Sequence, residues 1–186
     1  GVEAMTGFLS AFFNVRMIAP STAGVAMSAT IGAGATAQLG AMRINEEIDA
    51  LEVMGIRSMA YLASTRIVAG ILVVIPLYCI AVIMTFFAAR FLTISVYGQS
   101  RGVYDHYFST FLQPADLIWS FVATVIMAAT VMVIHTYYGF TASGGPAGVG
   151  EAVGRSVRAS MIATAFVVCT FMLAIYGQSG NFHLSG

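Results

Sequence analysis

Long apolar segments are the feature that most constrains the fold of this chain. Four of them approach the roughly 20 residues that an α-helix needs to cross the hydrocarbon core of a bilayer, at about 18–41, 67–89, 117–138 and 159–177. Only 9% of the 186 residues are charged, against about 25% in a typical soluble domain. We therefore predict an all-α, polytopic membrane protein whose helices form a transmembrane bundle.

The charged residues exclude two classes of function. Every basic residue is an arginine, and the formal net charge is zero. The phosphate-binding loop of ATPases requires a lysine, so the chain itself cannot hydrolyse ATP through such a site. Proteins that bind nucleic acid need a basic surface to neutralise phosphates, and this chain has none. We expect a protein that is not an enzyme, that binds no nucleic acid and that holds no metal or cofactor of its own.

Arginine placement predicts the topology. Two of the segments between spans hold five arginines, and the segment between the second and third spans holds two: Arg43, Arg57, Arg66, Arg155 and Arg158, against Arg90 and Arg101. Cytoplasmic loops carry the excess of positive charge. Residues 42–66 and 139–158 are therefore predicted in the cytoplasm of a multi-pass protein of the cytoplasmic (inner) membrane, with the C-terminus outside.

The segment between the first two spans has the pattern of a short amphipathic helix over about 46–54. Asn45 is a good N-cap, and Gly55 is well placed to end the helix. An apolar stripe follows helical spacing, and acidic residues occupy much of the remainder: Ile44, Ile48, Leu51 and Met54, then Glu46, Glu47, Asp49 and Glu52. A helix that rests on lipid headgroups is usually basic. The acidic face therefore favours docking into a basic groove of a soluble protein over resting on the membrane.

The first span carries a strip of small residues. Gly24, Ser28, Gly32, Thr36 and Gly40 recur every four residues and so share one helix face. Small residues let helices approach closely in lipid. The strip predicts either packing within one subunit, or a subunit interface or a moving contact beside a transport pathway.

These motifs resemble those of the MlaE/YrbE permeases, the membrane subunits of ABC transporters that work with MCE proteins. The resemblance rests on Gly40-Ala41-Met42-Arg43, Glu46-Glu47, Leu51-Glu52 and Met54. Arg16 and Pro20 match the spacing of the family's Arg-Glu-x-x-Pro stretch, and 141–160 is similar to its last cytoplasmic loop. The chain resembles the actinobacterial YrbE permeases of mycobacterial Mce systems most closely.

The resemblance implies a function and a set of partners. Residues 1–186 would form one permease domain that lacks the family's N-terminal interfacial helix and first transmembrane helix. The 46–54 helix would be the coupling helix, whose contacts with a cytoplasmic ABC ATPase come from Arg43, Glu46, Glu47, Ile48, Asp49, Leu51, Glu52 and Met54. ATP and Mg would bind that ATPase. A second YrbE-type permease, a paralogue in a heterodimer, MCE subunits on the outer face and a lipid cargo (fatty acids, sterols or phospholipids) would complete the transporter.

Three points stay open at this stage. Arg16 near a membrane boundary is either a contact for a lipid headgroup or carboxylate, or a side chain that snorkels to the interface. His135 is either a proton-relay group or a packed histidine.

Met17, Ile31 and Gln38 replace charged residues that are common in the family. The alternatives to a lipid permease are a scaffold subunit of the same complex that does not line the pathway, and a stand-alone secondary transporter.

Overall fold

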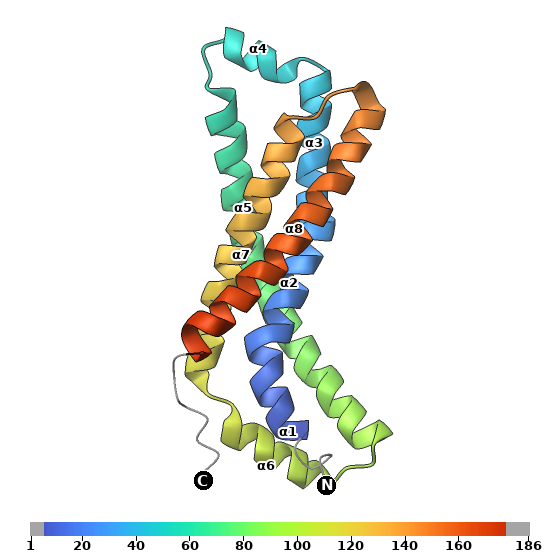
Figure 1. Ribbon diagram of the computed structural model, residues 1–186, viewed down its shortest axis with the longest axis vertical. Coiled ribbons are helices and arrows are strands. Elements are labelled where there is room, and N and C mark those ends of the chain that lie inside the picture. Colours follow the sequence, from blue (N-terminus) through green and yellow to red (C-terminus); the bar gives the residue numbers. More distant parts are fainter. Residues whose placement is uncertain (1–5, 178–186) are drawn as a thin grey trace. The chain divides into compact units, whose positions relative to one another are not determined.

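The computed structural model describes residues 6–177, which are helical almost throughout and contain no strand. The fold class predicted from sequence is therefore confirmed (Figure 1). In chain order the elements are α1 (Thr6–Leu9), the π-helical η2 (Ser10–Ile18), α2 (Ala19–Met27), the π-helical η3 (Ser28–Gly32), α3 (Ala33–Ile44), α4 (Glu47–Val53), α5 (Ser58–Phe91), the π-helical η4 (Leu92–Val96), α6 (Arg101–Phe111), α7 (Pro114–Phe140) and α8 (Gly145–Tyr176).

Three helical segments in the described part of the chain are long and apolar enough to cross a membrane: Ser58–Val96, Pro114–Phe140 and Gly145–Ile175. They contain the second, third and nearly all of the fourth predicted span. The first predicted span, 18–41, is also helical, but after Ile18, the last residue of η2, it is divided among α2, η3 and α3. None of these three pieces reaches 18 residues. The predicted C-terminal exterior falls outside the described residues.

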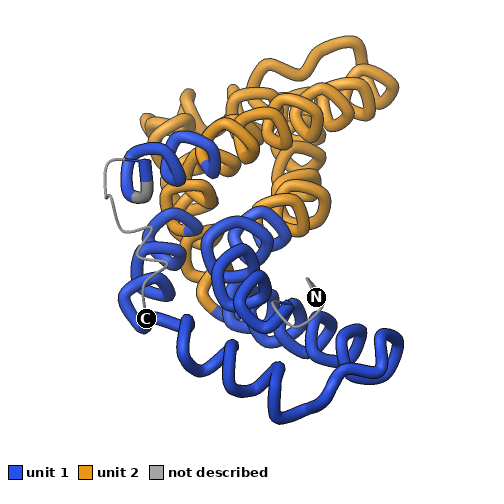
Figure 2. The backbone as a smooth tube through the Cα atoms, turned by 60° about the horizontal axis from the view of Figure 1, so that its bottom comes forward, with its two compact units in different colours: residues 1–23, 76–124, 168–186 blue, residues 24–75, 125–167 orange. Residues whose placement is uncertain are grey.

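The chain divides into two compact units (Figure 2). One contains residues 1–23, 76–124 and 168–186, and the other contains 24–75 and 125–167. The boundary falls within helices α2, α5, α7 and α8. In α5 it coincides with Pro76, which removes one backbone donor but does not end the helix. The single permease domain stays a prediction.

The first unit, with residues 1–23, is held together by aromatic and polar contacts. Phe8 packs edge-on against Phe111 with ring centroids 4.8 Å apart, and Phe86 packs against Phe108 at 4.9 Å. The buried Tyr104 hydroxyl donates to Ser10 Oγ at 3.0 Å. Burial raises the pKa of Tyr104, so the phenol stays a neutral donor at physiological pH. These contacts fix α6 against α1, η2 and α5.

The second unit, with residues 24–75, contains the apolar cluster nearest to α4. Leu39 of α3, Ile48 of α4 and Leu62 of α5 are buried together, and Met42, Leu51 and Phe140 pack against them. Burial of such side chains contributes about 1.5–3 kcal/mol each. The cluster thus anchors the short α4 helix to α3, α5 and α7.

Candidate functional site

Helix α4 lies across the ends of α3 and α5 (Figure 1). Its N-cap is Glu46, which has a left-handed backbone with φ of 61°. The prediction of Asn45 as N-cap was wrong, because Asn45 caps the C-terminal end of α3: its amide donates to the Ala41 carbonyl at 3.1 Å. With α3 extended this far, the chain reverses at Glu46.

The C-terminal end of α4 has a Schellman motif, as the position of Gly55 predicted. Gly55 has φ of 79°, and its amide donates to the Glu52 carbonyl at 2.9 Å. The next amide, that of Ile56, donates to the Leu51 carbonyl at 3.1 Å. These two bonds stop the helix after Val53, close to the predicted end at 54.

The predicted apolar stripe of α4 divides into an inward and an outward part. Ile48 is 2% exposed, and Leu51 packs against the cluster around it, so both hold α4 to its own subunit. Met54 is 66% exposed, and Val53, which the sequence did not single out, is 89% exposed. Val53 and Met54 are therefore the apolar side chains of α4 that a partner could contact.

The charges of α4 are also partly used within the chain. Arg43 pairs with Asp49 at 2.7 Å on the surface, and the Ser58 hydroxyl donates to Glu52 at 2.6 Å. Glu46 and Glu47 are exposed and take part in no ion pair among the described residues. An open hollow of about 380 Å³ lies at the C-terminal end of α4, lined by Glu52, Gly55, Ile56, Arg57, Ser58 and Met59. This end of the unit thus presents two unpaired carboxylates, two exposed apolar side chains and a hollow.

Arg16 forms a buried ion pair that the sequence did not reveal. Its guanidinium donates to Asp116 Oδ2 from Nε at 3.0 Å and from Nη2 at 2.6 Å. The two side chains are only 13% and 8% exposed, and the guanidinium carbon lies 3.9 Å from the centre of the Phe12 ring. Arg16 thus does not extend to the interface as a snorkelling side chain. Its positive charge is already paired with Asp116.

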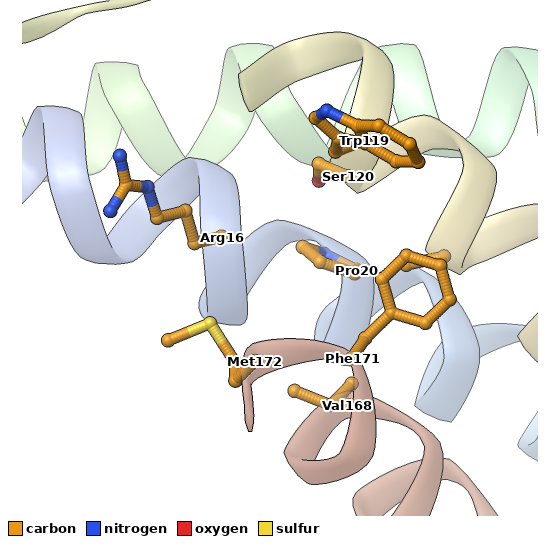
Figure 3. A pocket seen from close by; sticks show the side chains of 8 residues that line it. Arg16, Pro20, Trp119, Ser120, Val168, Phe171 and Met172 are labelled. Atoms are coloured by element: carbon orange, nitrogen blue, oxygen red, sulfur yellow. The ribbon is translucent and has the colours of Figure 1, made fainter. Parts of the chain in front are cut away.

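The hollow next to Arg16 is small (Figure 3). Its volume is about 10 Å³, and its walls include Pro20, Trp119, Ser120 and Phe171. That volume is about one water molecule. In Figure 3 the guanidinium extends away from Pro20 and Phe171. This hollow is too small for a lipid headgroup. Contact between Arg16 and a headgroup therefore stays a prediction, and it would need a binding site formed with residues beyond those that line this hollow.

The small-residue strip packs against α7 and α8 of the same chain. A Cβ on Gly24 would lie 2.9 Å from Thr164 Cγ2, and one on Gly40 would lie 2.8 Å from Val149 Cγ1. A Cβ on Gly32 would lie 2.6 Å from His135 Nε2. Ser28 and Thr36 are fully buried. In this structure the strip therefore packs within the subunit, and its role at a subunit interface or as a moving contact stays a prediction.

A buried polar cluster lies where the strip meets α7 and α8. His135 has no exposed surface, and its Nδ1 lies 2.8 Å from Thr36 Oγ1. Its Nε2 lies 3.0 Å from Ser160 Oγ, and Ser160 is hydrogen-bonded to Ser28. Thr36 Oγ1 also lies 3.1 Å from Ser156 Oγ. His135 is thus a packed histidine with both ring nitrogens engaged.

Two buried hydroxyls near this cluster are unpaired. Thr136 Oγ1 and Thr164 Oγ1 have no hydrogen-bond partner in the described part of the chain. An unsatisfied buried hydroxyl costs about 1–3 kcal/mol. Among residues 6–177 no three His, Cys, Asp or Glu side chains come together as metal ligands.

Comparisons with known proteins give a family match. The family model "Permease MlaE" matches residues 1–175. The chain is 27% identical over 184 residues to the chloroplast protein TRIGALACTOSYLDIACYLGLYCEROL 1 of Arabidopsis thaliana, covering 96% of this chain and 52% of that protein. It is 28% identical over 149 residues to a "Probable ABC transporter permease protein" of Rickettsia bellii, covering 79% and 57%.

A third relative is a "Probable ABC transporter permease protein" of Synechocystis, 23% identical over 163 residues, covering 88% of this chain and 62% of that protein. The chain thus spans between half and two thirds of the length of these relatives. They come from a plant chloroplast, Rickettsia and a cyanobacterium. The specific likeness to actinobacterial YrbE permeases therefore stays a prediction.

Proposed function

The chain belongs to the MlaE permease family, and from that premise we propose that it moves lipids across the cell envelope as the permease subunit of an ABC-type transporter. Its relatives named as ABC transporter permease proteins are membrane components rather than enzymes. ATP and Mg would bind a separate cytoplasmic ATPase. The name of the Arabidopsis relative is that of a galactolipid, which supports a lipid as the cargo class.

One observation carries the proposal: the outward face of α4. Val53 and Met54 are largely exposed, while Ile48 and Leu51 fix the helix to the subunit. The exposed apolar pair at one end of α4 and the Glu46 and Glu47 carboxylates at the other suit a basic, partly apolar groove on a soluble protein. We propose that this groove belongs to the ATPase and that α4 is the coupling helix.

A second permease would cover a different surface. Thr30, Gly34 and Gln38 of the first helical segment are exposed, on faces of the helix away from the packed strip. A polar amide such as that of Gln38 is costly against lipid tails, whereas small residues favour a closely packed helix. We propose that a second YrbE-type permease packs there and that lipid passes between the two. MCE subunits would dock on the outer face, opposite α4.

The test of this function is a pair of substitutions on α4. Replacing both Val53 and Met54 with Asp should lower ATPase recovery with a tagged chain about tenfold or more, since an unpartnered carboxylate in an apolar contact costs several kcal/mol. Both side chains are exposed, so the fold should persist. Recovery is measured by mass spectrometry after purification from native membranes.

The matched control replaces Tyr97 with Asp. Tyr97 is 64% exposed in the segment between α5 and α6, which the proposal places on the other side of the membrane. ATPase recovery should then be unchanged. Undiminished recovery with the Val53 and Met54 variant would contradict the docking role of α4. If the chain purifies without any ATPase, a stand-alone transporter is favoured. If it purifies with the ATPase but no lipid is bound to this chain, a scaffold subunit is favoured.

A further inference from the structure

Helix α8 carries a ladder of buried hydroxyls on the face that meets the small-residue strip. Ser156 and Ser160 have no exposed surface, and Thr164 is 2% exposed. They are spaced by four residues, so they lie one above another on one face of the helix. Each member of the ladder is thus one helical turn from the next, about 5.4 Å along the axis.

The strip and the ladder are in an antiparallel register. Ser28 is hydrogen-bonded to Ser160, and Thr36 Oγ1 lies 3.1 Å from Ser156 Oγ. Further along, Gly24 faces Thr164 so closely that a Cβ on the glycine would lie 2.9 Å from the threonine methyl. The last rung of the ladder therefore faces a glycine, and its hydroxyl has no partner in the described part of the chain.

A shift of α8 by one turn would re-form the same cluster with different members. Thr164 would take the place of Ser160 beside Ser28 and the Nε2 atom of His135, and Ser160 would take the place of Ser156 beside Thr36. The unpaired Thr164 hydroxyl would then gain partners. Movement of one element past another by a full turn is a known form of switching between packed states.

The surroundings of the ladder suit such a shift. Gly24, Gly32 and Gly40 alternate with the hydroxyls of the strip, so no large side chain on the strip blocks the passage of α8. Gly144 and Gly145, with φ of 87° and 71°, stand directly before and at the start of α8. Such left-handed glycines let the preceding loop change its path at little steric cost.

We propose that the second unit has two registers, one turn apart, between the small-residue strip and the hydroxyl ladder of α8, and that the transport cycle alternates between them. The assignment of the switch to a transport cycle rests on the proposed function. The observed register is the one with Thr164 unpaired. Thr164 is then a positioning residue for the second register rather than a contact for the cargo.

Replacement of Thr164 with Val separates this proposal from simple packing. Valine keeps the shape but removes the hydroxyl, so the observed register should become more heat-stable while the second register loses its hydrogen bonds. ATP-driven lipid transfer in proteoliposomes containing the whole complex should fall severalfold. Thr164→Ser keeps the hydroxyl and should retain transfer. Unchanged transfer by Thr164→Val would overturn the proposal.

Thr136→Val is the matched control. Thr136 is the other buried threonine with an unpaired hydroxyl in the part of the chain that the structure describes, but it lies on α7, outside the ladder. Its replacement should also raise heat stability and should leave transfer unchanged. A loss of transfer equal to that of Thr164→Val would contradict the proposal, because removal of any unpaired hydroxyl would then suffice.

Cross-linking reports the two registers without any measurement of transport. In full-length protein in lipid nanodiscs with Cys79 and Cys169 replaced by Ala, Ser28→Cys is combined with Ser160→Cys or with Thr164→Cys. Both pairs should form disulfides, and ATP with vanadate should change their ratio severalfold where the ATPase is bound. Formation of the first pair alone under every condition would overturn the proposal, and so would failure of both. If purification of the tagged chain recovers neither an ATPase nor a lipid, the proposed function fails. The cross-links still decide between one register and two.

Discussion

Replacing Arg16 with methionine should destabilise the protein by about 3–5 kcal/mol, because the Asp116 carboxylate would stay buried without its cation. The two side chains are 13% and 8% exposed and meet at 2.6 Å. Methionine preserves most of the apolar stem but removes the hydrogen-bond donors and the charge. The free energy of unfolding, measured by denaturation in mixed micelles, reports the loss.

A double-mutant cycle isolates the pair from the packing around it. Asp116→Asn alone should also destabilise, whereas Arg16→Met combined with Asp116→Asn should recover much of the loss, since no buried charge remains. Arg155→Met is the surface control: Arg155 and Glu151 pair at 2.8 Å but are 46% and 68% exposed, so the expected change is below about 1 kcal/mol. Equal effects at Arg16 and Arg155 would contradict the structural role of the buried pair.

The same variants test the predicted contact of Arg16 with lipid. If Arg16 also binds a headgroup, Arg16→Met should reduce co-purified lipid beyond the reduction caused by Asp116→Asn. Both variants lose the ion pair, but Arg16→Met alone loses the cation. Equal lipid content in the two variants would leave Arg16 with a structural role only.

The C-terminal end of α4 was predictable because its signal is local. A glycine after an amphipathic segment favours the left-handed C′ position, and Gly55 adopts it. Asn45 failed as an N-cap for a tertiary reason: α3 continues through Ile44, so one residue fewer was available for the turn. Helical periodicity predicted that Ile48, Leu51 and Met54 share one apolar stripe. It could not predict which part of the stripe is buried, because the residues that bury Ile48, namely Leu39 and Leu62, lie outside the segment.

The buried polar contacts were not predictable from spacing. Arg16 and Asp116 are separated by 100 positions, and Thr36 and His135 by 99. The sequence of each helix shows which residues share a face. It does not show which face of another helix they contact, because that depends on tertiary packing. The four-residue spacing of Ser156, Ser160 and Thr164 is visible in the sequence. The register between these three residues and the small-residue strip of residues 24–40 becomes visible only in the structure, where α8 packs against the strip.

The role of the small-residue strip leads to the second large prediction. Gly32→Ala should destabilise the second unit by about 1–3 kcal/mol from overpacking, since the new Cβ would lie 2.6 Å from His135 Nε2 and 2.9 Å from its Cγ. His135 has no exposed surface and cannot swing into solvent. A displaced ring would also lose its hydrogen bonds to Thr36 and Ser160, whose hydroxyls would keep Ser156 and Ser28 as partners.

Gly34→Ala is the matched control because it makes the same chemical change two positions away. A Cβ on Gly34 would meet nothing within 4 Å. Alanine favours the helix over glycine by about 0.5–1 kcal/mol, so this variant should be neutral or slightly more stable. The heat stability of both variants is compared in one detergent. Should Gly32→Ala prove as benign as Gly34→Ala, the His135 cluster would not be packed against the strip, and the register on which the α8 ladder depends would have to be abandoned.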